Sequence, residues 1–124
     1  MHFPVFLPVT AITLNASSYK FDPGQKVLSF TGRLGDGQTV TFAEQATPDP
    51  FNDIPNYYTQ FLTKIFEYEA FDSLQGTVHL THPNGAGQAA VMNAKGTLMF
   101  VRVAHDEPKS AWQQIFNKLV VYST

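Results

Sequence analysis

Cysteine is absent from this chain of 124 residues. Its absence excludes disulfides, thiol-based catalysis and iron–sulfur clusters, and it removes the ligand on which most structural zinc sites depend. The cellular compartment stays open, because exported chains and cytosolic chains can both lack cysteine.

The chain also has no large excess of positive or negative charge. Eight basic and ten acidic residues give a formal net charge of −2, and they are scattered along the chain without runs. Proteins that bind nucleic acid or an anionic membrane usually carry an excess of basic residues. We therefore expect no nucleic-acid partner.

Long hydrophobic runs are missing as well. The most apolar stretch near the start, Phe3 to Leu14, is interrupted by Pro4, Pro8 and Thr10, and no basic segment precedes it. A signal peptide and a membrane span both need an unbroken apolar segment. We expect neither of them here, and no membrane insertion by this part of the chain.

Apolar and aromatic residues, by contrast, are plentiful. Hydrophobic residues make up 44% of the sequence, with eleven Phe and five Tyr. This composition supplies enough apolar surface to offset the entropy lost on folding, so disorder is not expected. Because 124 residues suit one ordinary domain but not two, we predict a single domain spanning residues 1–124.

A β-hairpin is the clearest local pattern. Leu28 and Phe30 alternate with polar residues, and Val40 and Phe42 do the same after a short Asp-Gly turn. Alternation with period two is typical of half-buried strands, and Asp-Gly turns accept the positive φ values that tight hairpins need. We predict a hairpin over about residues 26–45.

Helical spacing appears in two places. From Asp53, a residue type that often caps helices, apolar residues recur three and four positions apart, and the same spacing recurs around Trp112. We predict helices over about residues 54–66 and 107–122, each packing its apolar side on a sheet.

Three further strands follow the first predicted helix. Residues 76–81, 88–92 and 97–104 have β character and are separated by segments rich in Gly, Asn and Pro, so a meander is the simplest arrangement. The predicted fold class is therefore α+β, a twisted antiparallel sheet of about five to six strands with two packed helices.

Histidine is the first residue type to consider for catalysis or metal binding. His79, His82 and His105 lie at the ends of predicted strands. However, His79 and His82 differ in strand parity and should point to opposite faces. We predict no metal site, and we interpret these residues as two surface imidazoles and one residue at a helix entry.

Other catalytic patterns are weak. Glu67, Glu69 and Asp72 lie close together, but acidic residues between elements are usually solvated and no second motif supports them. No serine lies in a G-x-S-x-G motif. We therefore predict that the domain is not an enzyme and has no cofactor.

Aromatic residues around the first predicted helix are the candidate binding residues. They are Tyr57, Tyr58, Phe61, Tyr68 and Phe71. Exposed Tyr57, Tyr68 or Phe71 would form an interface with a protein partner or with a second copy. Alternatively, a pocket near Tyr58 and Phe61 would hold a small apolar ligand, or the residues would simply belong to the core.

Several segments together resemble a known group of proteins. Phe-Pro-Val-Phe-Leu-Pro at 3–8, the hairpin sequence at 27–42 and Ala-Glu-Gln-Ala-Thr-Pro at 43–48 resemble uncharacterised extracytoplasmic domains of ultrasmall candidate-phylum bacteria. Those proteins typically carry one N-terminal transmembrane helix, which these 124 residues do not contain. The resemblance implies a surface-exposed sheet-and-helix domain, related to bacterial lipoprotein and PsbP-like domains, and it brings no functional residues.

Two functions are consistent with these observations. The first is a non-enzymatic extracytoplasmic binding or interaction domain, with a protein partner or self-association through an open sheet edge. The alternative is a carrier of a small apolar ligand or lipid. An extracytoplasmic or cell-surface location follows from the resemblance alone, and a cytoplasmic location stays open.

Overall fold

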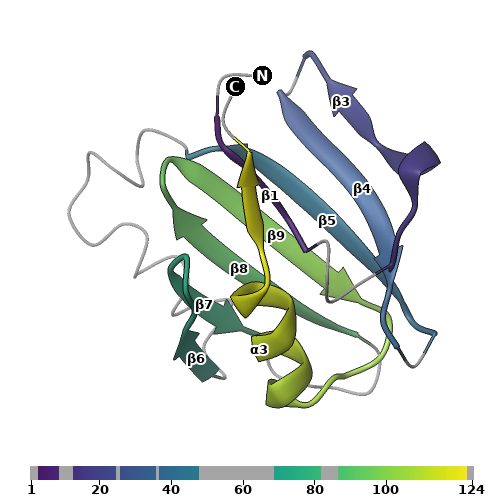
Figure 1. Ribbon diagram of the computed structural model, residues 1–124, viewed down its shortest axis with the longest axis vertical. Coiled ribbons are helices and arrows are strands. Elements are labelled where there is room, and N and C mark those ends of the chain that lie inside the picture. Colours follow the sequence, from purple (N-terminus) through teal and green to yellow (C-terminus); the bar gives the residue numbers. More distant parts are fainter. Residues whose placement is uncertain are drawn as a thin grey trace.

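The computed structural model is mostly β-sheet. It describes residues 3–8, 13–24, 26–35, 37–47, 69–81 and 87–122. Within these ranges the large antiparallel sheet comprises β2 (Thr13–Leu14), β3 (Lys20–Asp22), β4 (Val27–Arg33), β5 (Thr39–Ala46), β6 (Glu69–Asp72), β7 (Thr77–Leu80), β8 (Gln88–Ala94) and β9 (Thr97–Val103) (Figure 1). The remaining elements are a two-stranded ribbon of β1 (Val5–Leu7) and β10 (Val120–Tyr122), a 3-10 helix η1 (Ala16–Ser18) and an α-helix α3 (Lys109–Asn117).

The order of strands in the sheet is β2-β4-β5-β9-β8-β7-β6, and β3 also pairs with β4. The predicted hairpin is confirmed, because β4 pairs antiparallel with β5 from Leu28 opposite Glu44 to Arg33 opposite Thr39. The predicted meander is confirmed by β7, β8 and β9, which also pair antiparallel in sequence order. Antiparallel pairing of β5 with β9 joins the two halves into one sheet.

The predicted five- to six-stranded sheet with two packed helices is wrong. The described residues form an eight-stranded sheet, a separate two-stranded ribbon and a single α-helix. The helix predicted over 107–122 ends at Asn117, and Val120–Tyr122 forms β10 instead. The reason is β10's partner β1, which lies at the other end of the chain and leaves no trace in local helical spacing. The helix predicted over 54–66 lies outside the described residues.

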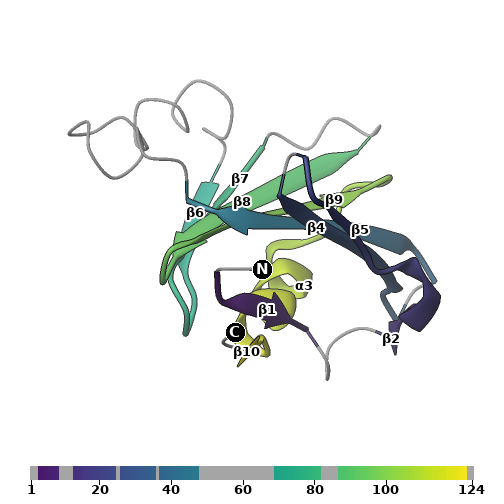
Figure 2. The same cartoon turned by 90° about the horizontal axis from the view of Figure 1, so that it is seen from above.

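Helix α3 and the β1–β10 ribbon lie against the same face of the sheet, which curves around them (Figure 2). We call this the core face and the opposite one the outer face. Trp112, Ile115 and Phe116 are the buried residues of α3, and they occur at the spacing of one helix face. The core face of the sheet supplies the other half of the hydrophobic core, with the members Leu28, Phe30, Val40, Phe42, Phe71, Val78, Leu80, Ala90, Met92, Met99, Val101 and Val103.

A buried glutamine anchors α3 to the sheet. The Oε1 of Gln88 on β8 accepts hydrogen bonds from Trp112 Nε1 at 2.9 Å and from the backbone N–H of Glu107 at 3.2 Å. Its Nε2 donates to the carbonyl of Thr81 at 3.2 Å. Burying a polar group is tolerated when its hydrogen bonds are made, so Gln88 fixes where the helix begins relative to β8.

The two edges of the large sheet are short and polar. One edge is interrupted, because η1 separates β2 from β3, and the other is the four-residue strand β6. The side chains of Lys20 and Asp22 on β3 and of Asp72 on β6 are exposed. Interruption and exposed charge are features that discourage edge-to-edge pairing. Self-association through an open edge stays a prediction.

Candidate functional site

Alternation along the strands decides which side chains reach the outer face. Because Leu28 and Phe30 on β4 and Val40 and Phe42 on β5 face the core, the residues between them face outward. Antiparallel partners that lie opposite each other share a face, so the register extends this assignment to the neighbouring strands.

The outer face over β2 and the neighbouring parts of β4 and β5 is polar, and Lys20, Arg33 and Arg102 add positive charge to it. The same face also carries the exposed Asp22 on β3, and Leu98 and the half-buried Phe100 on β9. Lys20 lies opposite Ser29, and Thr13 and Thr39 both lie opposite Arg33. Further along, Thr31 lies opposite Thr41, which in turn lies opposite Arg102. We call this surface the cationic patch, with the members Lys20, Arg33, Arg102, Thr13, Ser29, Thr31, Thr39 and Thr41.

The three cations of the patch are well separated. Arg33 and Arg102 lie two strands apart and are offset by one outward-facing position, which places their Cα atoms roughly 12 Å apart. Lys20 and Arg33 lie on adjacent strands and are offset by two such positions, or about 14 Å.

All three cations are exposed. Among the described residues, none of the three forms an ion pair with a carboxylate. An ion pair between Lys109 Nζ and Glu69 Oε1, at 3.0 Å, lies outside the patch. Arg33 and Arg102 are therefore available to an anion from outside, whereas Lys20 shares its face of β3 with the exposed carboxylate of Asp22 two residues away.

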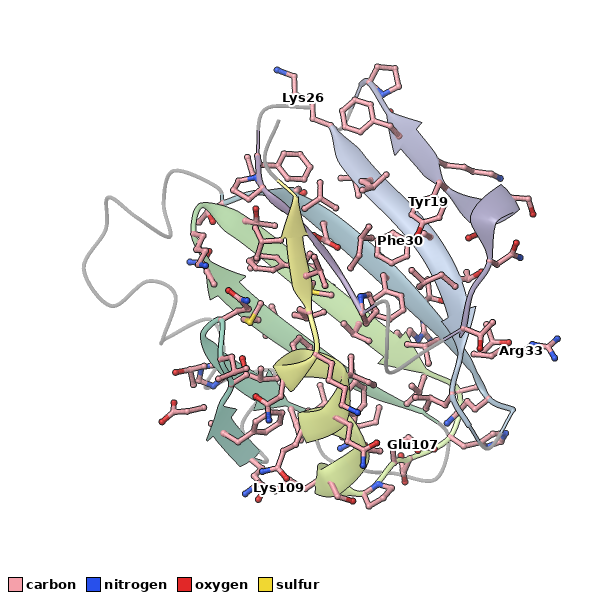
Figure 3. The ribbon with its side chains drawn as sticks, viewed as in Figure 1. Tyr19, Lys26, Phe30, Arg33, Glu107 and Lys109 are labelled. Atoms are coloured by element: carbon pink, nitrogen blue, oxygen red, sulfur yellow. The ribbon has the colours of Figure 1, made fainter. Side chains whose placement is uncertain are left out.

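An open groove of about 340 Å³ lies at one end of the patch. It is lined by Thr13, Leu14, Asn15, Thr31, Gly32, Arg33 and Thr39. Arg33 projects outward from this end of the sheet (Figure 3). Asn15 Oδ1 accepts hydrogen bonds from the N–H and the hydroxyl of Ser17 at 3.1 and 2.8 Å, which leaves the Asn15 amide group as a donor. The groove thus combines a guanidinium, an amide donor and three hydroxyls.

The aromatic residues predicted to bind a ligand or partner are mostly outside the described ranges. This applies to Tyr57, Tyr58, Phe61 and Tyr68. Phe71 lies on the core face of β6, is 7% exposed and meets the ring of Phe116 edge-on at a centroid distance of 6.3 Å. Binding through this group of residues stays a prediction.

The histidines do not form a recognisable centre in the described region. His79 lies on the outer face of β7, and partial burial lowers its pKa. His105 lies exposed beyond the end of β9, and His82 is outside the described ranges. Among the described residues, no group of three or more His, Asp or Glu side chains is placed to hold a metal ion.

The acidic residues that were considered for acid–base chemistry are separated by the fold. Glu69 pairs with Lys109, whereas Asp72 accepts a hydrogen bond from the hydroxyl of Thr77 at 3.0 Å. The two residues have opposite strand parity on β6 and so point to opposite faces. Glu67 lies outside the described ranges.

Glu44 is a buried carboxyl that the sequence analysis did not single out. Its side chain is 1% exposed on the core face of β5, where Oε1 accepts a hydrogen bond from the backbone N–H of Phe6 at 2.7 Å. Oε2 is buried and has no hydrogen-bond partner among the residues that the structure describes. Burial raises the pKa of Glu44 to about 8, and the Phe6 N–H opposes this to a smaller extent. This carboxyl ties β1 to the large sheet.

Comparison of the chain with protein-family models, with curated proteins and with solved structures gave no match. Within the described ranges, no helix has the length and apolar character needed to cross a membrane. The case for a function therefore depends on the chemistry of the cationic patch and its groove.

Proposed function

We propose that this chain is a non-enzymatic binding domain whose ligand is a polar anion held at the cationic patch. The observation that carries the proposal is Arg33, an exposed guanidinium that lines the groove and has no carboxylate partner among the described residues. A guanidinium presents several N–H donors in a planar fork, which suits a carboxylate or another oxyanion.

The rest of the groove supports a ligand that also carries hydroxyl groups. Thr13, Thr31 and Thr39 each offer a hydroxyl that can donate and accept, and Asn15 offers an amide donor. A volume of about 340 Å³ is at the lower end of the range of small-molecule sites. A sugar acid of one ring, with a carboxylate for Arg33 and hydroxyls for the threonines, has this chemistry.

The experiment compares galacturonate with galactose, which differ in the carboxylate. We expect the protein to broaden the proton NMR signals of galacturonate and to affect those of galactose much less. Arg33→Ala should weaken galacturonate binding about tenfold or more, because a hydrogen bond to a charged group contributes roughly 1.5–3 kcal/mol. Lys118→Ala is the matched control, since it removes one exposed positive charge beyond α3 and outside the patch.

Equal binding of the two sugars, or equal affinity of the Arg33→Ala and Lys118→Ala variants, would contradict this function. Far-ultraviolet circular dichroism of both variants should match that of the parent protein, because both side chains are exposed.

The apolar-carrier alternative concerns a different part of the molecule. It relies on Tyr58 and Phe61, which lie outside the described ranges, while the groove at Arg33 is lined by other residues, three threonines and Asn15 among them. The groove chemistry therefore supports the binding-domain function and adds nothing to the carrier function.

We further propose an extracytoplasmic location, because residues 3–8 and 27–48 resemble segments of extracytoplasmic domains. Protease added to intact source cells should then degrade the domain, while a cytosolic marker protein in the same cells stays whole. Protection of both proteins would contradict the proposed location.

A further inference from the structure

The cationic patch extends well beyond the groove. Arg33 lies in the groove, whereas Arg102 and Lys20 do not line it and have Cα atoms about 12 and 14 Å from that of Arg33. A ligand of one ring in the groove leaves these two positive charges without a counterpart. Their placement suits a longer ligand in which negative charges recur.

The surface between the cations is lined with hydroxyl groups. Thr41 separates Thr31 on β4 from Arg102 on β9, and Ser29 lies beside Lys20. Thr39 and Thr41 are exposed, and Ser29 and Thr31 are half-buried. Such a surface offers hydrogen bonds to the hydroxyls of sugar rings while its cations meet acidic groups.

The exposed aromatic side chains lie outside the cationic patch. Single-stranded nucleic acid is bound mainly by aromatic rings on which bases stack, together with positive charge. The described aromatic rings with high exposure, Tyr19 at 37% and Phe21 at 40%, do not belong to the patch, and Phe100, two residues from Arg102 on the outer face, is half-buried. Tyr19 stacks on the core residue Phe30 at 5.0 Å, and Phe21 lies opposite the core-facing Leu28. The patch thus favours an acidic sugar chain over a nucleic acid.

We infer that the cationic patch binds an acidic polysaccharide, a chain of uronate sugars that starts in the groove at Arg33 and crosses β5 to Arg102. This inference rests on the proposed function, because it extends the ligand of the same groove. It adds Arg102 as a contact that a single sugar does not reach.

The test is native electrophoresis in gels that contain polygalacturonate, dextran or no polymer, with oligo-dT as a third additive. We expect polygalacturonate to retard the protein and dextran, which is neutral, to have no effect. Arg102→Ala should weaken the apparent affinity for polygalacturonate about tenfold or more, which corresponds to the loss of one charge-assisted contact. Lys118→Ala removes one positive charge, as Arg102→Ala does, and polygalacturonate should retard it as much as the parent protein. Comparing the two variants therefore removes the effect of net charge on mobility.

Two results would overturn the inference. One is equal retardation of the Arg102→Ala and Lys118→Ala variants by polygalacturonate. The other is stronger retardation by oligo-dT than by polygalacturonate, which would assign the patch to nucleic acid. If free galacturonate binds but the polymer binds no more tightly, the polysaccharide inference fails while the proposed function stands; if neither binds, both fail.

Discussion

Raising the pH from about 5 to about 8 should strongly destabilise the domain, and Glu44→Gln should abolish most of this loss. The physical reason is the burial of Glu44, which raises its pKa from 4.5 to about 8 in the folded protein. In the unfolded chain the carboxyl is in water and ionises near its ordinary pKa. Between these two values the folded protein retains a proton that the unfolded chain has released.

This difference in bound protons determines whether the free energy of unfolding rises or falls with pH. Where the folded state binds more protons than the unfolded state, the free energy of unfolding falls as the pH rises, by up to about 1.4 kcal/mol for each pH unit. The contribution of Glu44 is fully present below about pH 4.5 and is lost as the pH rises toward about 8. The whole window amounts to a few kcal/mol, a large part of the 5–15 kcal/mol that is typical of domain stability.

Urea unfolding of the parent protein and of Glu44→Gln at several pH values measures this effect. Glutamine keeps an oxygen acceptor for the Phe6 N–H and cannot ionise, so its stability should depend far less on pH in this window. Glu69→Gln is the matched control, because Glu69 is partly exposed and its removal should leave the slope close to that of the parent protein. Equal slopes for the parent protein and Glu44→Gln would show that the buried carboxyl does not hold a proton.

Phe42→Ala should produce the second large effect, a loss of about 3–5 kcal/mol of unfolding free energy. Phe42 is 0% exposed on β5 and its ring stacks on Phe30 at a centroid distance of 4.8 Å. The substitution removes apolar surface at the centre of the core, and the neighbouring strands are paired on both sides of β5 and cannot close the resulting cavity fully.

Phe21→Ala is the control for this prediction. It makes the same chemical change on the edge strand β3, where the ring is 40% exposed, and should cost about 1 kcal/mol or less. Denaturant unfolding of both variants gives the comparison. Similar losses for the two would mean that the core is not centred on β4 and β5.

Local patterns in the sequence were sufficient to predict part of this fold. The hairpin of β4 and β5 and the meander of β7, β8 and β9 follow from alternation and from turn residues, because each strand pairs with its neighbour in the chain. The pairing of β1 with β10 could not be predicted in this way, since it joins Val5 to Tyr122 and no local signal specifies so distant a partner.

The candidate site was missed for a related reason. Lys20, Arg33 and Arg102 lie far apart in the sequence and come together only through the order of strands in the sheet. A partial signal was present, because Arg33 has the outward parity of the predicted hairpin and Arg102 interrupts the apolar run of the strand predicted over 97–104. Glu44 also had a signal, because it shares the inward parity of Phe42.

The measurement that tests the proposed function most directly is a titration of the 15N-labelled protein with trigalacturonate, followed by two-dimensional amide NMR. We predict that the shifted signals gather on the outer face, at Thr31, Arg33, Thr41 and Arg102, and that Val120 on the ribbon stays unchanged. Shifts confined to the ribbon and α3, or no shifts while the protein remains folded, would contradict a binding site at the cationic patch.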